Sequence, residues 1–100
     1  MEERANHHSE YPRTVTEAVD WLESIVPAGE LELIAAMDVD DVVGLHVELG
    51  AYIRERLGLW SGNDALMEDA LALHAVDASM VIVMALWQRL HQAARFSMSA

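Results

Sequence analysis

The sequence contains no cysteine and no lysine among its 100 residues. Without cysteine the chain cannot form disulfides, use a thiolate nucleophile or bind zinc or an iron–sulfur cluster through sulfur. The six basic residues are all arginine and are outnumbered by 17 Asp and Glu residues, which gives a formal net charge of −11. This charge argues against nucleic acid or an anionic membrane as the partner, because both attract Lys and Arg.

Long apolar runs are also missing. The most apolar stretch, residues 78–87, is ten residues long, whereas a membrane-spanning helix needs about 20 apolar residues. Residues 1–12 are polar and lack the apolar core of a signal peptide. We therefore expect no membrane partner, and a cytoplasmic location follows by default.

Apolar residues make up 53% of the chain, and they recur at the three- and four-residue spacing of helices. No stretch of strand length alternates between apolar and polar residues. The pattern predicts an all-α protein, a single small bundle of about five helices. The expected helices cover residues 15–26, 30–37, 39–57, 64–74 and 78–96. The expected organisation is a flexible N-terminal arm at 1–13, a helical domain at 14–96 and a loose C-terminal end at 97–100.

Several polar residues have the spacing of helix caps. Thr14 precedes Glu17 by three residues, as in a capping box, and Asp38 is suited to cap the third helix. Gly58 is placed to end that helix in left-handed geometry. Asp77 is a candidate N-cap for the last helix.

Two further expectations concern turns and packing. Asn63 or Ser61 can cap the fourth helix. Gly44 and Gly50 fall inside the third helix, where each costs roughly 1 kcal/mol relative to Ala. Either the helix tolerates these glycines, or another helix or a bulky ring approaches them closely, and Trp87 is the candidate.

The acidic residues are concentrated in one region. Residues 14–53 contain nine acids and no Lys or Arg, whereas residues 78–100 contain two Arg and no acid. These acids either solvate the outer faces of helices or form a docking face for a basic protein. The candidate partner-binding residues are Asp20, Glu23, Glu30, Glu32, Asp38, Asp40 and Asp41.

A second candidate site surrounds the segment from Tyr52 to Asn63. Arg54 could bond carbonyls at the helix end or pair with an acid, Asp64 or Asp77. Alternatively, Arg54 could line a ligand notch together with Trp60 and Asn63.

Catalytic groupings are not evident. No two of the five histidines lie at the three- or four-residue spacing that puts two metal ligands on one helix face. No phosphate-binding, dinucleotide-binding or nucleophile-elbow motif occurs. We therefore expect no metal, no cofactor and no enzymatic activity.

The sequence around the third helix resembles a small bacterial domain family of unknown function. The family signature reads approximately LG-x-x-IR-x-x-x-GLW-x-GN-x-x-L, and the matching residues are Leu49, Gly50, Ile53, Arg54, Gly58, Leu59, Trp60, Gly62, Asn63 and Leu66. Weaker similarity extends over about residues 14–90 and includes His46, Asp77 and Ser79. The sequence departs from the family at Ala75 and Val76, where Pro and Asp are common. The resemblance implies no activity, but it marks a possible polar site or structural network: His46, Arg54, Trp60, Asn63, Asp77 and Ser79.

These observations favour a non-catalytic acidic module of the immunity, inhibitor or anti-defence type that docks a basic protein. An alternative is a small-molecule site or minor enzyme around His46, Arg54, Asn63 and Asp77. A third option is a homodimer formed through surplus apolar surface. The methionines that could serve it are Met37, Met67, Met80 and Met84.

Overall fold

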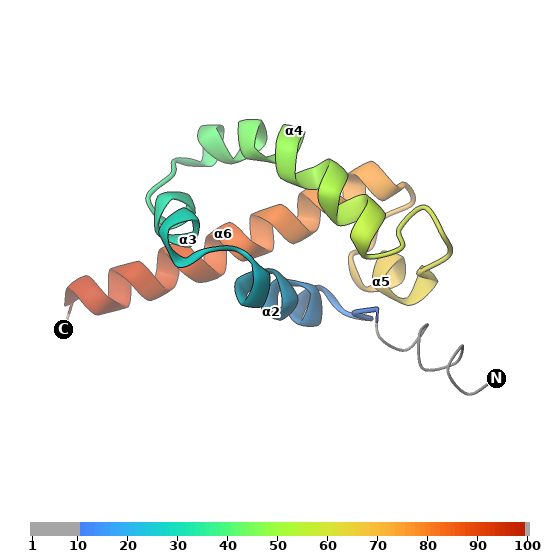
Figure 1. The fold of residues 1–100 in the computed structure, drawn as a ribbon, viewed down its shortest axis with the longest axis horizontal. Coiled ribbons are helices and arrows are strands. Elements are labelled where there is room, and N and C mark those ends of the chain that lie inside the picture. Colours follow the sequence, from blue (N-terminus) through green and yellow to red (C-terminus); the bar gives the residue numbers. More distant parts are fainter. Residues whose placement is uncertain (1–10, 100) are drawn as a thin grey trace.

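The backbone of residues 11–99 and the side chains of residues 11–95 are described by a computed structural model. Figure 1 shows that this part of the chain is built from helices, with no strand among the described residues. The helices are α2 (Val15–Ile25), α3 (Ala28–Ala35), α4 (Val39–Arg56), α5 (Asp64–Asp69) and α6 (Ala75–Ser99). The predicted all-α bundle of about five helices is confirmed.

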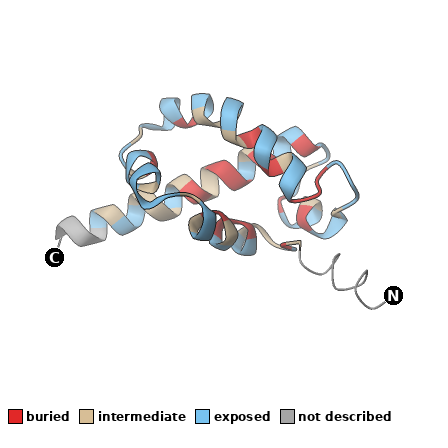
Figure 2. Ribbon diagram, viewed as in Figure 1, coloured by how far each residue is buried: buried red, intermediate tan, exposed pale blue. Residues whose placement is uncertain are grey.

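Helix α6 lies at the centre of the bundle and contacts α2, α3, α4 and α5. Its first half is apolar on most sides, so it can be covered from several directions at once. Ala78, Ile82, Val83 and Leu86 are completely buried there. Figure 2 shows buried positions along α6 and along the part of α4 that is nearest α5.

Local capping signals position α2 and α4. Thr14 Oγ1 accepts a hydrogen bond from the Glu17 amide at 3.1 Å, and the Glu17 carboxylate accepts from the Arg13 amide at 2.9 Å. At α4, the Asp38 amide donates to the Asp41 carboxylate at 3.2 Å. Each cap supplies side-chain oxygens that accept hydrogen bonds from backbone amides at the start of the helix, because these amides have no acceptor within the helix. The predicted starts of these two helices are therefore correct.

The end of α4 also follows the prediction. Gly58 has a φ of +70°, and the Leu59 amide donates to the Arg54 carbonyl at 3.1 Å. This is the geometry in which a left-handed residue closes a helix and turns the next side chain back onto it. Leu59 is accordingly buried.

The N-terminal segment next to α2 packs on this turn. A Cβ at Gly58 would lie 2.6 Å from Cε2 of Tyr11, so the Tyr11 ring occupies the space over the glycine. Pro12 is buried as well. Residues 11–13, which were expected to belong to a flexible arm, thus contact the domain, and the rest of the predicted arm lies outside the described residues.

Several other boundaries differ from the prediction. Helix α3 begins at Ala28 with Pro27 as its N-cap, so residues expected in a turn are helical. Helix α5 ends at Asp69 instead of extending to residue 74, and two leucines of the expected helix, Leu71 and Leu73, are almost fully exposed. Neither leucine has an apolar surface to cover, so a longer α5 would gain little from packing.

Helix α6 begins at Ala75, two residues before Asp77. Asp77 therefore lies in the first turn and is not the N-cap, although a carboxylate there is still favourable near the helix N-terminus. At the other end the helix continues through Ser99, past the predicted end at Phe96. No helix in the described part of the chain has the length and apolarity needed to cross a membrane.

Candidate functional site

Two of the candidate partner-binding acids form ion pairs with another helix of the bundle. Nη1 of Arg89, on α6, lies 2.6 Å from Oδ1 of Asp20 and 3.0 Å from Oε2 of Glu23, both on α2. The Arg89 guanidinium thus forms ion pairs with both carboxylates and connects α6 to α2. Asp20 and Glu23 are therefore partly neutralised, and they are less available to a basic partner than their spacing in the sequence suggests.

The three aspartates near residue 40 gather at the first turn of α4. Asp38 and Asp41 are joined by the capping hydrogen bond, and Asp40 is exposed beside them. Negative charge at this end of a helix is stabilised by the helix dipole. These residues therefore have a structural role that requires no partner.

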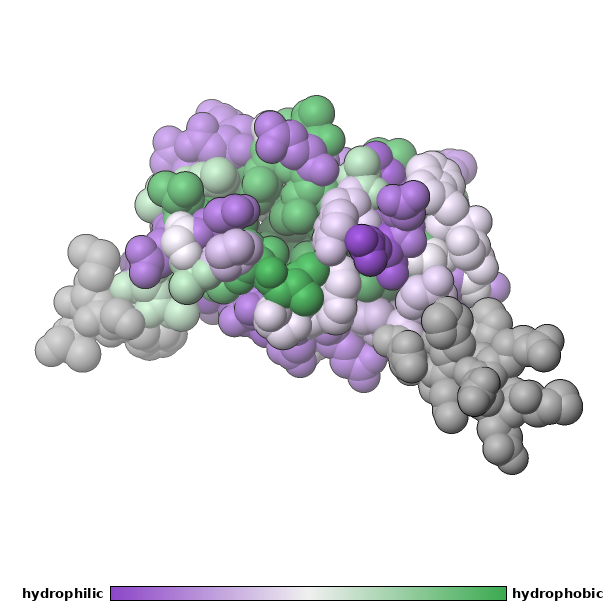
Figure 3. All heavy atoms as spheres, viewed as in Figure 1, coloured by the Kyte–Doolittle hydropathy of each residue, from purple (hydrophilic) through white to green (hydrophobic). Residues whose placement is uncertain are grey.

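A groove lies between α3 and α4 and has an apolar floor. Its volume is about 200 Å³, and its lining is Val26, Glu30, Ile34, Leu45, Glu48, Leu49 and Tyr52. Glu30 and Glu48 are exposed, whereas Ile34 is buried and Leu45 and Leu49 are half-buried. Figure 3 shows hydrophobic residues gathered in a hollow between α4 above and α2 below, with hydrophilic residues around it.

Aromatic rings stand at one side of this groove. The Tyr52 ring stacks on Trp21 of α2, with centroids 6.1 Å apart and an interplanar angle of 17°. The Arg56 guanidinium lies over the Tyr52 ring at 5.2 Å. The two stacked rings join α2 to α4, and Tyr52 gives the groove an aromatic wall.

Of the seven candidate acids, only Glu30 lines the groove; Glu32 is exposed elsewhere on α3. Glu48, the second acid of the groove, is one of the nine acids of residues 14–53 but is not among the site residues predicted from the sequence. Its place two turns into α4 gave no signal, because the groove arises only when α3 and α4 both pack against α6.

Three residues of the predicted polar network do converge. His46 and Arg54 are both on α4, and both reach Ser79 on α6: Nε2 of His46 lies 2.8 Å from the Ser79 Oγ, and Nη1 of Arg54 donates to it at 2.9 Å. The Ser79 hydroxyl donates to the Val76 carbonyl at 2.9 Å. Ser79 is completely buried, and these three contacts satisfy the hydrogen-bonding capacity of its hydroxyl.

Gly50 makes this convergence possible. It lies one turn after His46 and one turn before Arg54, and a Cβ there would lie 2.5 Å from Cδ2 of His46 and 3.0 Å from Nη1 of Arg54. Both side chains therefore fold over the bare backbone of Gly50. The expected packing of Trp87 on Gly44 or Gly50 is wrong: nothing lies within 4 Å of a Cβ at Gly44. The Trp87 indole instead donates to the Met37 carbonyl at 2.9 Å and stacks on His91.

The environment of His46 favours its neutral form. Burial lowers the pKa of His46, the Arg54 guanidinium lowers it further, and the nearby Val76 carbonyl opposes this by favouring the protonated ring. With the Ser79 proton directed at Val76, the Ser79 oxygen accepts from Arg54 and from the Nε2 proton of His46. The contact thus joins α4 to α6 through a neutral imidazole.

The other three members of the predicted network lie elsewhere. Asn63 caps α5 by accepting from the Leu66 amide at 3.4 Å, and its Nδ2 donates to the carbonyls of Leu57 and Pro12 at 2.8 and 3.0 Å. Trp60 is 66% exposed, with the Arg54 guanidinium 6.0 Å from its ring. Asp77 is exposed. Arg54 therefore bonds Ser79 and lies near Trp60. Of the alternatives for Arg54, neither the bonds to carbonyls at the helix end nor the pair with Asp64 or Asp77 is among the contacts of its side chain with the described residues.

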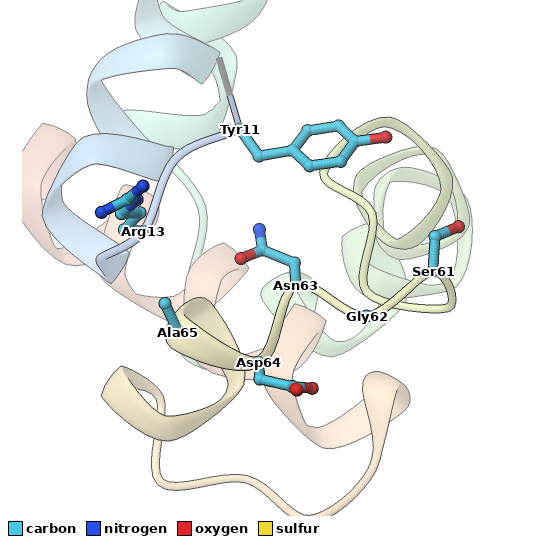
Figure 4. Close-up of a pocket in the computed structure, with 7 residues that line it drawn as sticks. All are labelled: Tyr11, Arg13, Ser61, Gly62, Asn63, Asp64 and Ala65. Atoms are coloured by element: carbon cyan, nitrogen blue, oxygen red, sulfur yellow. The ribbon is translucent and has the colours of Figure 1, made fainter. Parts of the chain in front are cut away.

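A second pocket, of about 240 Å³, lies beside Asn63. Figure 4 shows the Asn63 side chain pointing toward the segment that carries Tyr11, while the Asp64 carboxylate points away. Neither Arg54 nor Trp60 lines this pocket, so it is not the expected notch. Both polar ends of Asn63 are occupied by the bonds described above. Among the described residues, no group of three or more His, Cys, Asp or Glu is placed to hold a metal ion.

Comparison with known proteins gives a family. No curated protein and no solved structure matches the chain. Residues 11–90 match the family described as "Domain of unknown function (DUF6794)". The match begins at Tyr11, the residue that packs on Gly58, and it ends in the second half of α6. The chain therefore belongs to the DUF6794 family, a family of unknown function, as the resemblance implied.

Proposed function

We propose that this protein is a non-catalytic interaction module that binds a basic protein partner in the groove between α3 and α4. One observation carries the proposal: an apolar floor is bordered by two exposed carboxylates, Glu30 and Glu48, in a part of the chain that has no Lys or Arg from residue 14 to residue 53. An apolar surface whose lining includes two carboxylates and no basic residue fits an apolar anchor flanked by cations.

The two parts of the groove have different roles in this proposal. Leu45, Leu49 and Ile34 provide the apolar area, which gives affinity when an anchor side chain displaces water. Glu30 and Glu48 accelerate association and select for Lys or Arg next to the anchor. The partner segment is therefore expected to carry a Leu, Ile or Phe within one helical turn of basic residues.

The alternative, a small-molecule or catalytic site, draws no support from the geometry of its four residues. His46 and Arg54 converge on Ser79, but that hydroxyl has no exposed surface, and Asn63 is engaged in capping bonds. We assign these polar residues to positioning the helices. The bacterial cytoplasm remains the proposed setting, and an immunity, inhibitor or anti-defence role remains the proposed class.

A peptide-display selection tests the proposal and does not require that the partner be identified first. A random library is selected on the immobilised chain, and the best peptide is titrated into labelled protein while amide chemical shifts are followed. The proposal expects selected peptides that combine an apolar anchor with Lys or Arg, and shift changes at Glu30, Leu45, Glu48 and Tyr52. Acidic selected peptides, or shifts confined to other surfaces, would refute it.

A further inference from the structure

Helix α4 carries a second apolar surface, on a different side from the groove. Val39, Val43 and Val47 follow one another at four-residue spacing and are 50%, 56% and 74% exposed. The groove uses Leu45, Leu49 and Tyr52 of the same helix, which point to another side at 100° per residue. The three exposed valines make a continuous apolar row along one side of the helix.

Helix α6 extends this surface. The two helices run antiparallel (Figure 1), and their register is set by the His46–Ser79 contact and by the bond from Trp87 to the Met37 carbonyl. That register places the row of Val39, Val43 and Val47 alongside a row of α6 residues with the same four-residue spacing. The six residues form what we call the valine–methionine strip: Val39, Val43, Val47, Val76, Met80 and Met84.

The strip is neutral on a strongly acidic protein. None of its six residues is ionisable, whereas the chain carries a net charge of −11. Two copies that approach through other acidic surfaces repel each other, and this repulsion is smallest along a neutral strip. Methionine side chains at Met80 and Met84 are half-buried and can adapt their shape to an opposing surface.

The charges at the two ends of α4 are complementary to each other. Asp40 lies in the first turn and Arg54 in the last part of the helix, on the same side as Val43 and Val47. Arg54 uses one guanidinium nitrogen for Ser79, and the group has further N–H donors. When two α4 helices lie antiparallel with Val47 opposite Val47, Asp40 of one copy faces Arg54 of the other. The same register puts Val43 opposite Ala51.

We propose that the valine–methionine strip is the surface through which two copies of this chain associate, with their α4 helices antiparallel around a twofold axis at Val47. A closed twofold contact buries the same surface on both copies. It forms the Asp40–Arg54 pair twice, once with the aspartate from each copy. The grooves between α3 and α4 stay open in this arrangement. The dimer and the groove are therefore independent, and each can be tested while the other is intact.

Sedimentation equilibrium gives the first test. The wild-type chain is expected to rise from 11.1 kDa toward twice that mass with increasing concentration. Val47→Glu places a carboxylate on the axis and is expected to weaken association by at least about tenfold. Leu33→Glu introduces the same charge at a leucine on α3 that is 67% exposed and lies off the strip, so it should leave association unchanged.

Single cysteines give the second test, because the chain has no cysteine of its own. Under mild oxidation Val47→Cys is expected to form a disulfide-linked dimer efficiently. Val43→Cys should crosslink poorly with itself but well with an Ala51→Cys chain. Circular dichroism verifies that each variant is folded, and retained binding of a groove peptide by Val47→Glu shows that the groove is unaffected.

Three results would overturn the proposal. The first is a wild-type chain that stays at 11.1 kDa up to millimolar concentration. The second is association that survives Val47→Glu, because the contact then lies elsewhere. The third is self-crosslinking of Val43→Cys as efficient as that of Val47→Cys, which indicates parallel helices.

Discussion

Nε2 of His46 lies 2.8 Å from the Oγ of Ser79, and this contact joins α4 to the buried centre of α6. The serine is completely buried, and a buried hydroxyl without partners is costly. Its three hydrogen-bond partners come from two helices, so the contact sets how α4 lies along α6. The groove and the valine–methionine strip are on the two sides of α4, and both depend on this placement.

The first prediction concerns pH. The folded state lowers the pKa of His46, so the unfolded chain binds the proton more readily. The stabilisation from the neutral imidazole is present above the unfolded value of about 6.5 and declines as the pH falls through it. Urea unfolding at a series of pH values from 5 to 8 is expected to show this decline. In His46→Gln the component due to His46 should disappear, and an unchanged pH profile in that variant would contradict the assignment.

The second prediction compares two glycines in the same helix. Gly44 has open space at its Cβ position, so Gly44→Ala is expected to stabilise the protein by about 0.5–1 kcal/mol. Gly50 lies under His46 and Arg54, so Gly50→Ala is expected to destabilise it by about 1–3 kcal/mol because both side chains must shift. Equal stabilisation by the two alanines, measured by chemical unfolding, would show that the polar contact does not require Gly50.

The third prediction concerns Asn63. Its side chain caps α5 and also holds the Leu57 and Pro12 carbonyls, so Asn63→Ala is expected to cost about 1–3 kcal/mol. Ser61, the other cap candidate in the sequence, is exposed, and Ser61→Ala is expected to change stability by less than about 0.5 kcal/mol. If the two alanines had similar effects on the free energy of unfolding, Asn63 would not be the residue that joins these segments.

The features that the sequence predicts well are those that depend on neighbours in the chain. The cap at Asp38 and Asp41 and the left-handed turn at Gly58 need only a few consecutive residues, and both are present. Other residues of this segment also act on close neighbours in the chain: Gly50 accommodates His46 and Arg54, Gly58 ends α4, and Asn63 begins α5.

The features that the sequence predicts poorly depend on packing between distant segments. Asp77 has the chemistry of an N-cap, but α6 begins at Ala75, which is buried in the core. Trp87 is large enough to cover a glycine, yet its indole reaches the Met37 carbonyl instead. Glu48 and Glu30 line one groove only because α4 and α3 both pack against α6. Position along one helix carries no information about such a neighbour.

The binding role of the groove is the central claim, and charge reversal at its rim tests it most directly. The affinity of a display-selected basic peptide is measured by calorimetry for wild type, Glu48→Lys and Glu68→Lys. Glu68 is exposed on α5 and outside the groove, so its reversal changes the net charge equally. We predict that Glu48→Lys weakens binding by about three- to tenfold and that Glu68→Lys has little effect. Equal losses from the two reversals would mean that the net charge, and not the groove, attracts the peptide, which would contradict the claim.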